Sequence, residues 1–202
     1  YNFIEDYEIS FMIVFIVLVT LLILYIVYEN HTRNKELLKY AQTDALTGLY
    51  NKETTEQLTD ELLSEDENKY HAFLILDVDC FKQINDIYGH AVGDIVLQKF
   101  GKLLKGTFRE GDILGRIGGD EFGVIMKNIQ TKDIAMKKAE ELLAKTQAYK
   151  IDELKGNNIS ISIGISTAPQ DGDCYMDLYK RADQALYQAK RSGKARVCNY
   201  FS

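Results

Sequence analysis

Adjacent carboxylates at Asp120 and Glu121 are the residues in this chain whose arrangement most directly suggests chemistry. They follow Gly118 and Gly119, and two glycines permit the positive φ angles of a tight turn and let a ligand approach the backbone. A hairpin turn needs only Asn-Gly or Asp-Gly, so the two acids are not required for folding. Their use would be metal binding and proton acceptance at a phosphate site.

A second pair of acids, Asp77 and Asp79, closes an apolar run. Residues 72–76 read Ala-Phe-Leu-Ile-Leu, which predicts a strand buried on both faces. A bare carboxylate beside it would be costly. A hard cation would offset that cost, and carboxylates together with backbone carbonyls suit Mg²⁺. A pair of solvated aspartates at a strand end is the alternative, and both interpretations stay open at this point.

Four polar residues between these two pairs have the side chains that a nucleotide site needs. Lys82 would neutralise a phosphate, while Asn85 and Asp94 can together read a base edge, because an amide donates and accepts and a carboxylate accepts. His90 is either a ligand contact or a structural histidine after Gly89.

The C-terminal region adds three cations, Lys190, Lys194 and Arg196. They would meet triphosphate oxygens. The alternative is a solvated basic helix end that the helix dipole favours.

Alternating helices and strands must position these groups. Periodicity predicts helices over residues 51–68, 93–108, 131–150 and 176–191, and strands over 72–78, 112–117, 122–126, 159–167 and 195–200. Asn51 is the expected cap of the first helix. This order implies a layered α/β or α+β domain.

The N-terminal part has a different pattern. Residues 9–28 contain no charge, Gly or Pro and are long enough to cross a bilayer, so they predict a transmembrane helix. Basic residues follow this segment and none precedes it, which puts residues 1–8 outside and the C-terminal side in the cytoplasm. Residues 29–42 are expected to form a juxtamembrane signalling helix. A buried core helix and a signal peptide are weaker alternatives, because the leader is acidic and the segment is apolar on every face.

Bulk composition narrows the class of function. The 202 residues carry a formal net charge of −6, which gives no support for binding a nucleic acid polymer, since that needs a basic face. Three cysteines fit neither a zinc motif nor a disulfide framework, so free thiols are expected.

Six motifs in order closely resemble GGDEF-domain diguanylate cyclases. They are Asp44–Asn51, Asp77–Asp86, Gly89–Asp94, Arg116–Phe122, Ser162–Ile165 and Ala182–Lys190. The resemblance implies a palm-like α+β nucleotidyl cyclase fold over residues 43–202, with a central mixed sheet flanked by helices. It also implies condensation of two GTP molecules into cyclic di-GMP with release of pyrophosphate. Because one domain presents one GTP, the active form is expected to be a homodimer. The predicted span places it in the bacterial inner membrane, with the catalytic domain in the cytoplasm.

The resemblance further assigns roles to individual residues. Asp77, the carbonyl of Val78 and Asp120 would bind Mg²⁺, with Mn²⁺ as an alternative ion, and Asp120 or Glu121 would assist deprotonation of the attacking hydroxyl. The remaining residues would bind substrate: Asn85 and Asp94 the guanine, with His90 nearby, and Lys82, Lys190 and Lys194 the phosphates. The family commonly has Arg at the position of Lys194. Lys keeps the positive charge but cannot make the bidentate contact with a phosphate that a guanidinium makes.

Arg109 and Asp112 resemble the RxxD site through which cyclic di-GMP inhibits its own synthesis in this family. A helix-ending Arg followed by a strand-opening Asp is the alternative. Other readings of the whole chain are a silent domain that binds GTP or cyclic di-GMP as a receptor, a signal-transmitting scaffold, and a different nucleotidyl cyclase, which Asp94 disfavours.

Overall fold

The computed structural model describes residues 11–12, 15–30, 42–65 and 69–200. The chain divides into two compact units, Tyr1–Ala41 and Gln42–Ser202. In the first unit, residues 15–30 are helical. Among the described residues, no helix has both the length and the apolar character needed to cross a bilayer. The predicted span over 9–28 lies partly outside these residues, the stub 1–8 lies wholly outside them, and so does most of the predicted helix over 29–42.

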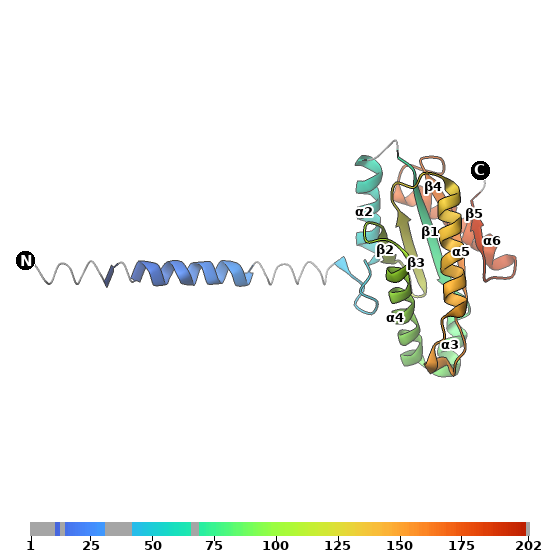
Figure 1. The fold of residues 1–202 in the computed structure, drawn as a ribbon, viewed down its shortest axis with the longest axis horizontal. Coiled ribbons are helices and arrows are strands. Elements are labelled where there is room, and N and C mark those ends of the chain that lie inside the picture. Colours follow the sequence, from blue (N-terminus) through green and yellow to red (C-terminus); the bar gives the residue numbers. More distant parts are fainter. Residues whose placement is uncertain (1–10, 13–14, 31–41, 66–68, 201–202) are drawn as a thin grey trace, which may run out of the picture. The chain divides into compact units, whose positions relative to one another are not determined.

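The second unit contains all of the elements that form the site (Figure 1). In chain order they are α2 (Lys52–Glu65), β1 (His71–Val78), α3 (Phe81–Tyr88), α4 (His90–Thr107), β2 (Ile113–Arg116), β3 (Glu121–Met126), α5 (Lys132–Ala148), the 3₁₀ turn η1 (Asp152–Leu154), β4 (Ile161–Ala168), α6 (Tyr175–Arg191) and β5 (Val197–Asn199). The predicted cap of α2 is confirmed, because the Asn51 side chain accepts a hydrogen bond from the Thr54 amide at 2.9 Å.

Five strands form one sheet in the order β2-β3-β1-β4-β5. All neighbouring pairs are antiparallel except β4 and β5, which are parallel. The predicted mixed sheet is therefore confirmed. In this register Asp77 on β1 lies opposite Glu121 on β3 and Ser162 on β4, which brings the two acidic motifs of the sequence together.

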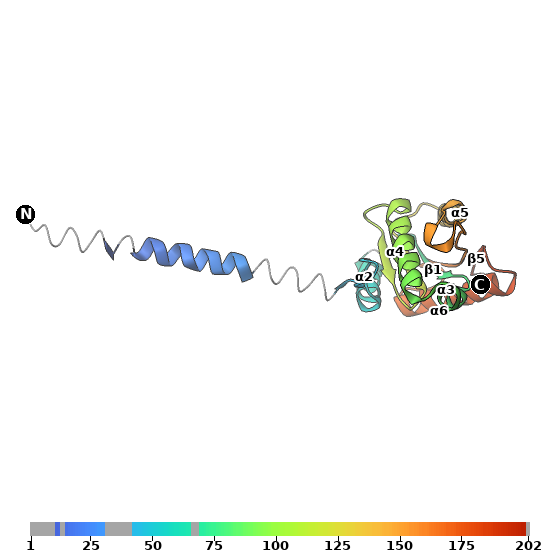
Figure 2. The same cartoon turned by 90° about the horizontal axis from the view of Figure 1, so that it is seen from below.

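Helices cover both faces of the sheet (Figure 2). Leu74 and Leu76 of β1 pack into a core with α4 and α5, while Phe73 and Ile75 pack against α6 and α2. All eight residues of β1 are buried, as the apolar run predicted. Because side chains alternate along a strand, Asp77 shares the face of Phe73 and Ile75 and points toward α6.

Two features differ from the predicted elements. Helix α3 was not expected, and α4 begins at His90 rather than at residue 93. Gly89 separates them with φ +85°, a left-handed value that ends one helix and turns the chain into the next. Strand β4 alternates Ile and Ser but is buried throughout. Helix α6 covers the face that carries Ser166, and the Ser166 hydroxyl donates to the carbonyl of Leu178 on α6 at 2.8 Å.

Candidate active site

Asp77 is a buried acid, with 7% of its surface exposed. Burial raises its pKa, and the nearby Lys190 opposes that rise without cancelling it. Lys190 on α6 places its Nζ 2.7 Å from Asp77 Oδ2. The lysine predicted to contact phosphate therefore neutralises the buried carboxylate in this structure.

Glu121 opens β3 on the same face. Burial raises its pKa, and the charges of Asp77 and Asp120 add to the rise. Its carboxylate folds back over the turn, so that a Cβ on Gly118 would lie 2.8 Å from Glu121 Oε2. A glycine at 118 leaves room for this carboxylate.

Asp120 lies at the tip of the hairpin, next to the end of β1. Its carbonyl accepts a hydrogen bond from the Val78 amide at 3.2 Å. The residues predicted to bind a metal, Asp77, Val78 and Asp120, therefore meet at one corner of the sheet.

This corner fits a hard divalent cation. Its donors are carboxylate and carbonyl oxygens, which Mg²⁺ and Mn²⁺ accept, and its buried carboxylate requires a cation. The donor atoms of Asp77, Asp120 and Glu121 are not gathered tightly in the present state, in which Lys190 lies against Asp77. Within the described ranges, the one group of three side-chain ligands lying within 4.8 Å of one another is Asp173, Cys174 and Asp177, in the segment that leads into α6.

Helices α3 and α4 form the predicted base-reading end. Asn85 has a buried Oδ1 without a hydrogen-bond partner, and such a carbonyl is suited to accept from a ligand N–H. It lies against Gly93, where a Cβ would come within 2.0 Å of that oxygen. Asp94 follows on the same helix, and the side chains of Lys82, His90 and Asp94 are all exposed.

Asp79 has a structural role that the sequence did not reveal. Its carboxylate accepts hydrogen bonds from the hydroxyls of Ser160 at 2.6 Å and Ser162 at 2.7 Å, and from the amide of Ala195 at 3.1 Å. It ties the end of β1 to β4 and to the segment that carries Lys194. No local pattern in the sequence indicates these distant partners.

Lys194 lies beside this anchor with a left-handed φ of +61°. Its Nζ donates to the sulfur of Cys80 at 3.1 Å, a contact that raises the lysine pKa. The structure thus places Lys194 at the acidic corner. The expected free thiols are confirmed for all three cysteines.

Arg109 and Asp112 form a separate site at the other end of β2. Arg109 Nε lies 3.0 Å from Asp112 Oδ1, and Asp112 also accepts from the Lys127 amide at 3.1 Å. The pair lines a hollow of about 590 Å³, together with residues that include Gln130 and Lys138. The two predicted residues therefore do meet at a concave surface, with Arg109 exposed and paired to Asp112.

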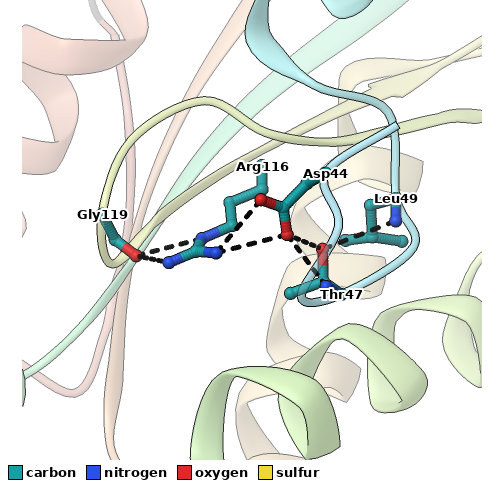
Figure 3. Close-up of polar contacts among 5 residues, drawn as sticks. All are labelled: Asp44, Thr47, Leu49, Arg116 and Gly119. Atoms are coloured by element: carbon teal, nitrogen blue, oxygen red, sulfur yellow. Dashed lines mark hydrogen bonds and ion pairs between the residues drawn. The ribbon is translucent and has the colours of Figure 1, made fainter. Parts of the chain in front are cut away.

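A polar network connects the start of the domain to the acidic hairpin (Figure 3). Arg116 Nη1 lies 3.2 Å from both oxygens of Asp44, and Arg116 Nε and Nη2 donate to the Gly119 carbonyl at 3.1 and 2.7 Å. The sequence marked Asp44 and Arg116 as motif members without giving either a role.

The fold and this corner together define a palm-like nucleotide cyclase domain. The family profile "Diguanylate cyclase, GGDEF domain" matches residues 41–196, and the chain belongs to that family. It is 37% identical to diguanylate cyclase A of Treponema denticola over 81% of this chain, but it spans only 46% of that relative's length.

Solved structures agree with this assignment. The GGDEF domain of TpbB from Pseudomonas aeruginosa has a TM-score of 0.74 and 33% identity, over 79% of this chain and 94% of that one. The GGDEF domain of DgcB from Caulobacter crescentus, solved in complex with c-di-GMP, has a TM-score of 0.74 and 27% identity, over 80% of this chain and 94% of that one.

Proposed function

We propose that this chain is a diguanylate cyclase that condenses two GTP molecules into cyclic di-GMP and pyrophosphate with Mg²⁺ or Mn²⁺. The observation that carries the proposal is the corner where Asp77 and Glu121 face each other across β1 and β3, with Lys190 2.7 Å from Asp77. A buried carboxylate paired with one ammonium, beside a second, half-buried carboxylate, suits the binding of a metal-triphosphate complex.

The residues of the candidate site would divide the reaction into proton transfer, phosphate binding and guanine binding. Glu121 would take the proton of the attacking 3′-hydroxyl, because burial has raised its pKa toward the working pH. When bound, the metal ion would neutralise charge on the phosphates. Lys190 would then be free to contact phosphate oxygens together with Lys82 and Lys194. Asn85 and Asp94 would hold the guanine, with His90 close to it.

The product has two phosphodiester links, and one domain presents one GTP. Two domains must therefore face each other, and we propose a homodimer with twofold symmetry as the active form. We further propose that residues 9–28 anchor the chain in the bacterial inner membrane with the catalytic domain in the cytoplasm, since the apolar run and the basic residues after it support that topology.

Product inhibition is the fourth part of the proposal. The DgcB structure contains c-di-GMP, and Arg109 and Asp112 of this chain line a hollow that offers an exposed guanidinium and a carboxylate. We propose that cyclic di-GMP binds there.

The test of the proposed function is direct product detection. Purified chain is incubated with GTP and Mg²⁺, and cyclic di-GMP is measured by mass spectrometry while sedimentation reports the oligomeric state. We expect product from the dimer and a loss of at least about a hundredfold for Asp120→Ala. A folded dimer that binds GTP without making product would instead support the receptor function.

A further inference from the structure

Residues 43–51 form a turn, here called the opening turn, through which the chain joins the catalytic domain. It is hydrogen-bonded to β2. The Tyr50 amide donates to the Leu114 carbonyl at 3.0 Å, and the Arg116 amide donates to the Tyr50 carbonyl at 2.8 Å. The opening turn begins at the second residue of the unit Gln42–Ser202.

Asp44 organises the opening turn and holds Arg116. Its Oδ1 accepts from the Thr47 amide at 2.8 Å and the Thr47 hydroxyl at 2.7 Å. Burial raises the Asp44 pKa, but the bonds from Thr47 and the charge of Arg116 outweigh burial, so the pKa is lowered. The ion pair is largely enclosed, with side-chain exposures of 16% for Arg116 and 23% for Asp44.

Arg116 also reaches the acidic hairpin through the other edge of its guanidinium. Two of its nitrogens donate to the Gly119 carbonyl. That carbonyl belongs to the peptide joining Gly119 to Asp120, and a Cβ at Gly119 would meet nothing within 4 Å. Among the described contacts, the side chain of Arg116 is what fixes this peptide.

The two peptides that flank the Asp120 Cα are therefore held by different elements. The sheet holds the peptide on the C-terminal side, because the Asp120 carbonyl accepts from Val78. Arg116 holds the peptide on the N-terminal side. Fixing both peptides sets the direction in which the Asp120 carboxylate leaves the backbone, and catalytic groups lose large factors in rate when misplaced by about 1 Å.

We propose that Arg116 is a positioning residue that couples the opening turn to the Asp120 carboxylate, so that turnover depends on the Asp44–Arg116 pair. The proposal rests on the cyclase function proposed above. It predicts that breaking the pair lowers kcat and metal affinity while leaving KM for GTP nearly unchanged, because no hydrogen bond among the described residues joins Asn85 or Asp94, the proposed guanine-binding residues, to Asp44 or Arg116.

The test measures kcat, KM and Mn²⁺ binding for Arg116→Met, Arg116→Lys, Asp44→Asn and the double variant Asp44→Asn with Arg116→Met. We expect Arg116→Met to lower kcat about tenfold or more, with KM within about twofold, and to weaken Mn²⁺ binding. Arg116→Lys should lower kcat nearly as much, because one ammonium cannot contact both Asp44 and Gly119. Arg116→Lys also separates positioning from stability, since it keeps the charge beside Asp44.

The double variant provides the decisive comparison. If Asp44 acts through Arg116, the double variant equals Arg116→Met, because independent effects would multiply instead. The matched control is the ion pair of Lys99 and Glu153, 2.6 Å apart on α4 and η1. Glu153→Gln should leave kcat unchanged and should multiply with Asp44→Asn.

Full kcat for a folded Arg116→Lys variant, or multiplicative effects of Asp44→Asn and Arg116→Met, would overturn the positioning role. Electron paramagnetic resonance measures Mn²⁺ binding in the absence of GTP. This measurement distinguishes the proposed positioning role of Arg116 from the proposed cyclase function. A wild-type chain that makes no cyclic di-GMP contradicts the cyclase function, whereas equal Mn²⁺ binding by wild type and Arg116→Met contradicts the positioning role.

Discussion

Asp77 is a buried carboxylate at the end of an otherwise apolar stretch of strand. Burial raises its pKa even with Lys190 in contact, so the folded domain pays in stability for keeping this carboxylate ionised at neutral pH. Functional sites commonly lower the stability of the fold in this way, because the charged group is needed to bind a ligand rather than to fold the chain.

Removing the charge should therefore stabilise the metal-free domain. The folded pKa of Asp77 is raised, so its penalty is full above that pKa and is relieved as pH falls through it. We expect Asp77→Asn to raise the thermal midpoint at pH 7.5 in EDTA by about 3 °C, near 1 kcal/mol for a domain of this size. The gain should shrink as the pH falls through the folded pKa of Asp77. Scanning calorimetry of both proteins over a pH series from 7.5 downward measures it.

Glu141 serves as the control, because its pKa is lowered whereas that of Asp77 is raised. Lys145 and Lys138 hold its carboxylate and lower its pKa to about 2. Glu141→Gln should therefore not stabilise the domain at any pH between 5 and 7.5. A difference between Asp77→Asn and wild type that stays constant however far the pH is lowered would contradict the account given for Asp77.

Gly93 determines the position of Asn85. A methyl group at 93 would lie 2.0 Å from Asn85 Oδ1, so Gly93→Ala must displace the amide proposed to bind guanine. We expect KM for GTP to rise about tenfold with a smaller change in kcat, because the acidic corner is untouched. Steady-state kinetics with GTP test this. Gly106→Ala on the same helix meets nothing within 4 Å and should leave KM unchanged.

At the scale of elements, the contact between α6 and β4 brings Lys190 to Asp77. Gly164 on β4 allows this contact. A Cβ there would lie 2.1 Å from the Ala182 carbonyl and 2.4 Å from the Leu186 amide nitrogen. These are backbone atoms of α6, which cannot rotate away as a side chain can.

Gly164→Ala should accordingly push α6 from the sheet. We expect a loss of about 3 kcal/mol or more in the free energy of unfolding, at the upper end for overpacked cores. Denaturant unfolding measures it. Gly106→Ala should instead be neutral or stabilising by about 0.5 kcal/mol, since alanine is the better helix former. A Gly164→Ala protein as stable as wild type would mean that α6 is not held as closely as the structure indicates.

The whole domain carries two candidate sites at opposite ends of β2. Arg116, at one end, contacts the acidic hairpin, and Arg109 and Asp112 lie just before the other end. A ligand in the hollow beside Arg109 would therefore act on turnover across the length of β2 rather than by competing for the corner at Asp77.

Arg109→Ala should weaken that inhibition. It removes an exposed guanidinium, so we expect unchanged kcat without product and at least a tenfold higher concentration of added cyclic di-GMP for half inhibition. The assay adds product to the initial-rate measurement. An inhibition curve identical to that of wild type would refute the proposed role of Arg109.

The sequence predicted some parts of the domain well. The apolar run of β1 and the Asn51 cap depend on neighbouring residues, so periodicity and capping chemistry are sufficient to locate them. The hairpin was also located, but neither Gly118 nor Gly119 has the positive φ angle that the turn was expected to use. Helix α3 was missed because it has only eight residues, and it starts after Cys80, whose left-handed φ of +57° no local pattern indicates. The burial of both faces of β4 was missed because α6 covers the serines from far along the chain.

The residue types of the acidic corner, their order and their match to one family were determined by the sequence alone. The tertiary structure decided which partners they have. Lys190 neutralises Asp77, Asp79 ties β1 to β4 and to the Lys194 segment, and Arg116 joins Asp44 to Gly119. Residues 44 and 116 are far apart in the chain, and only the pairing of the opening turn with β2 brings their charges together. For that reason the sequence identifies Asp44 and Arg116 only as members of two motifs. Their connection to the acidic hairpin becomes visible only in the folded domain.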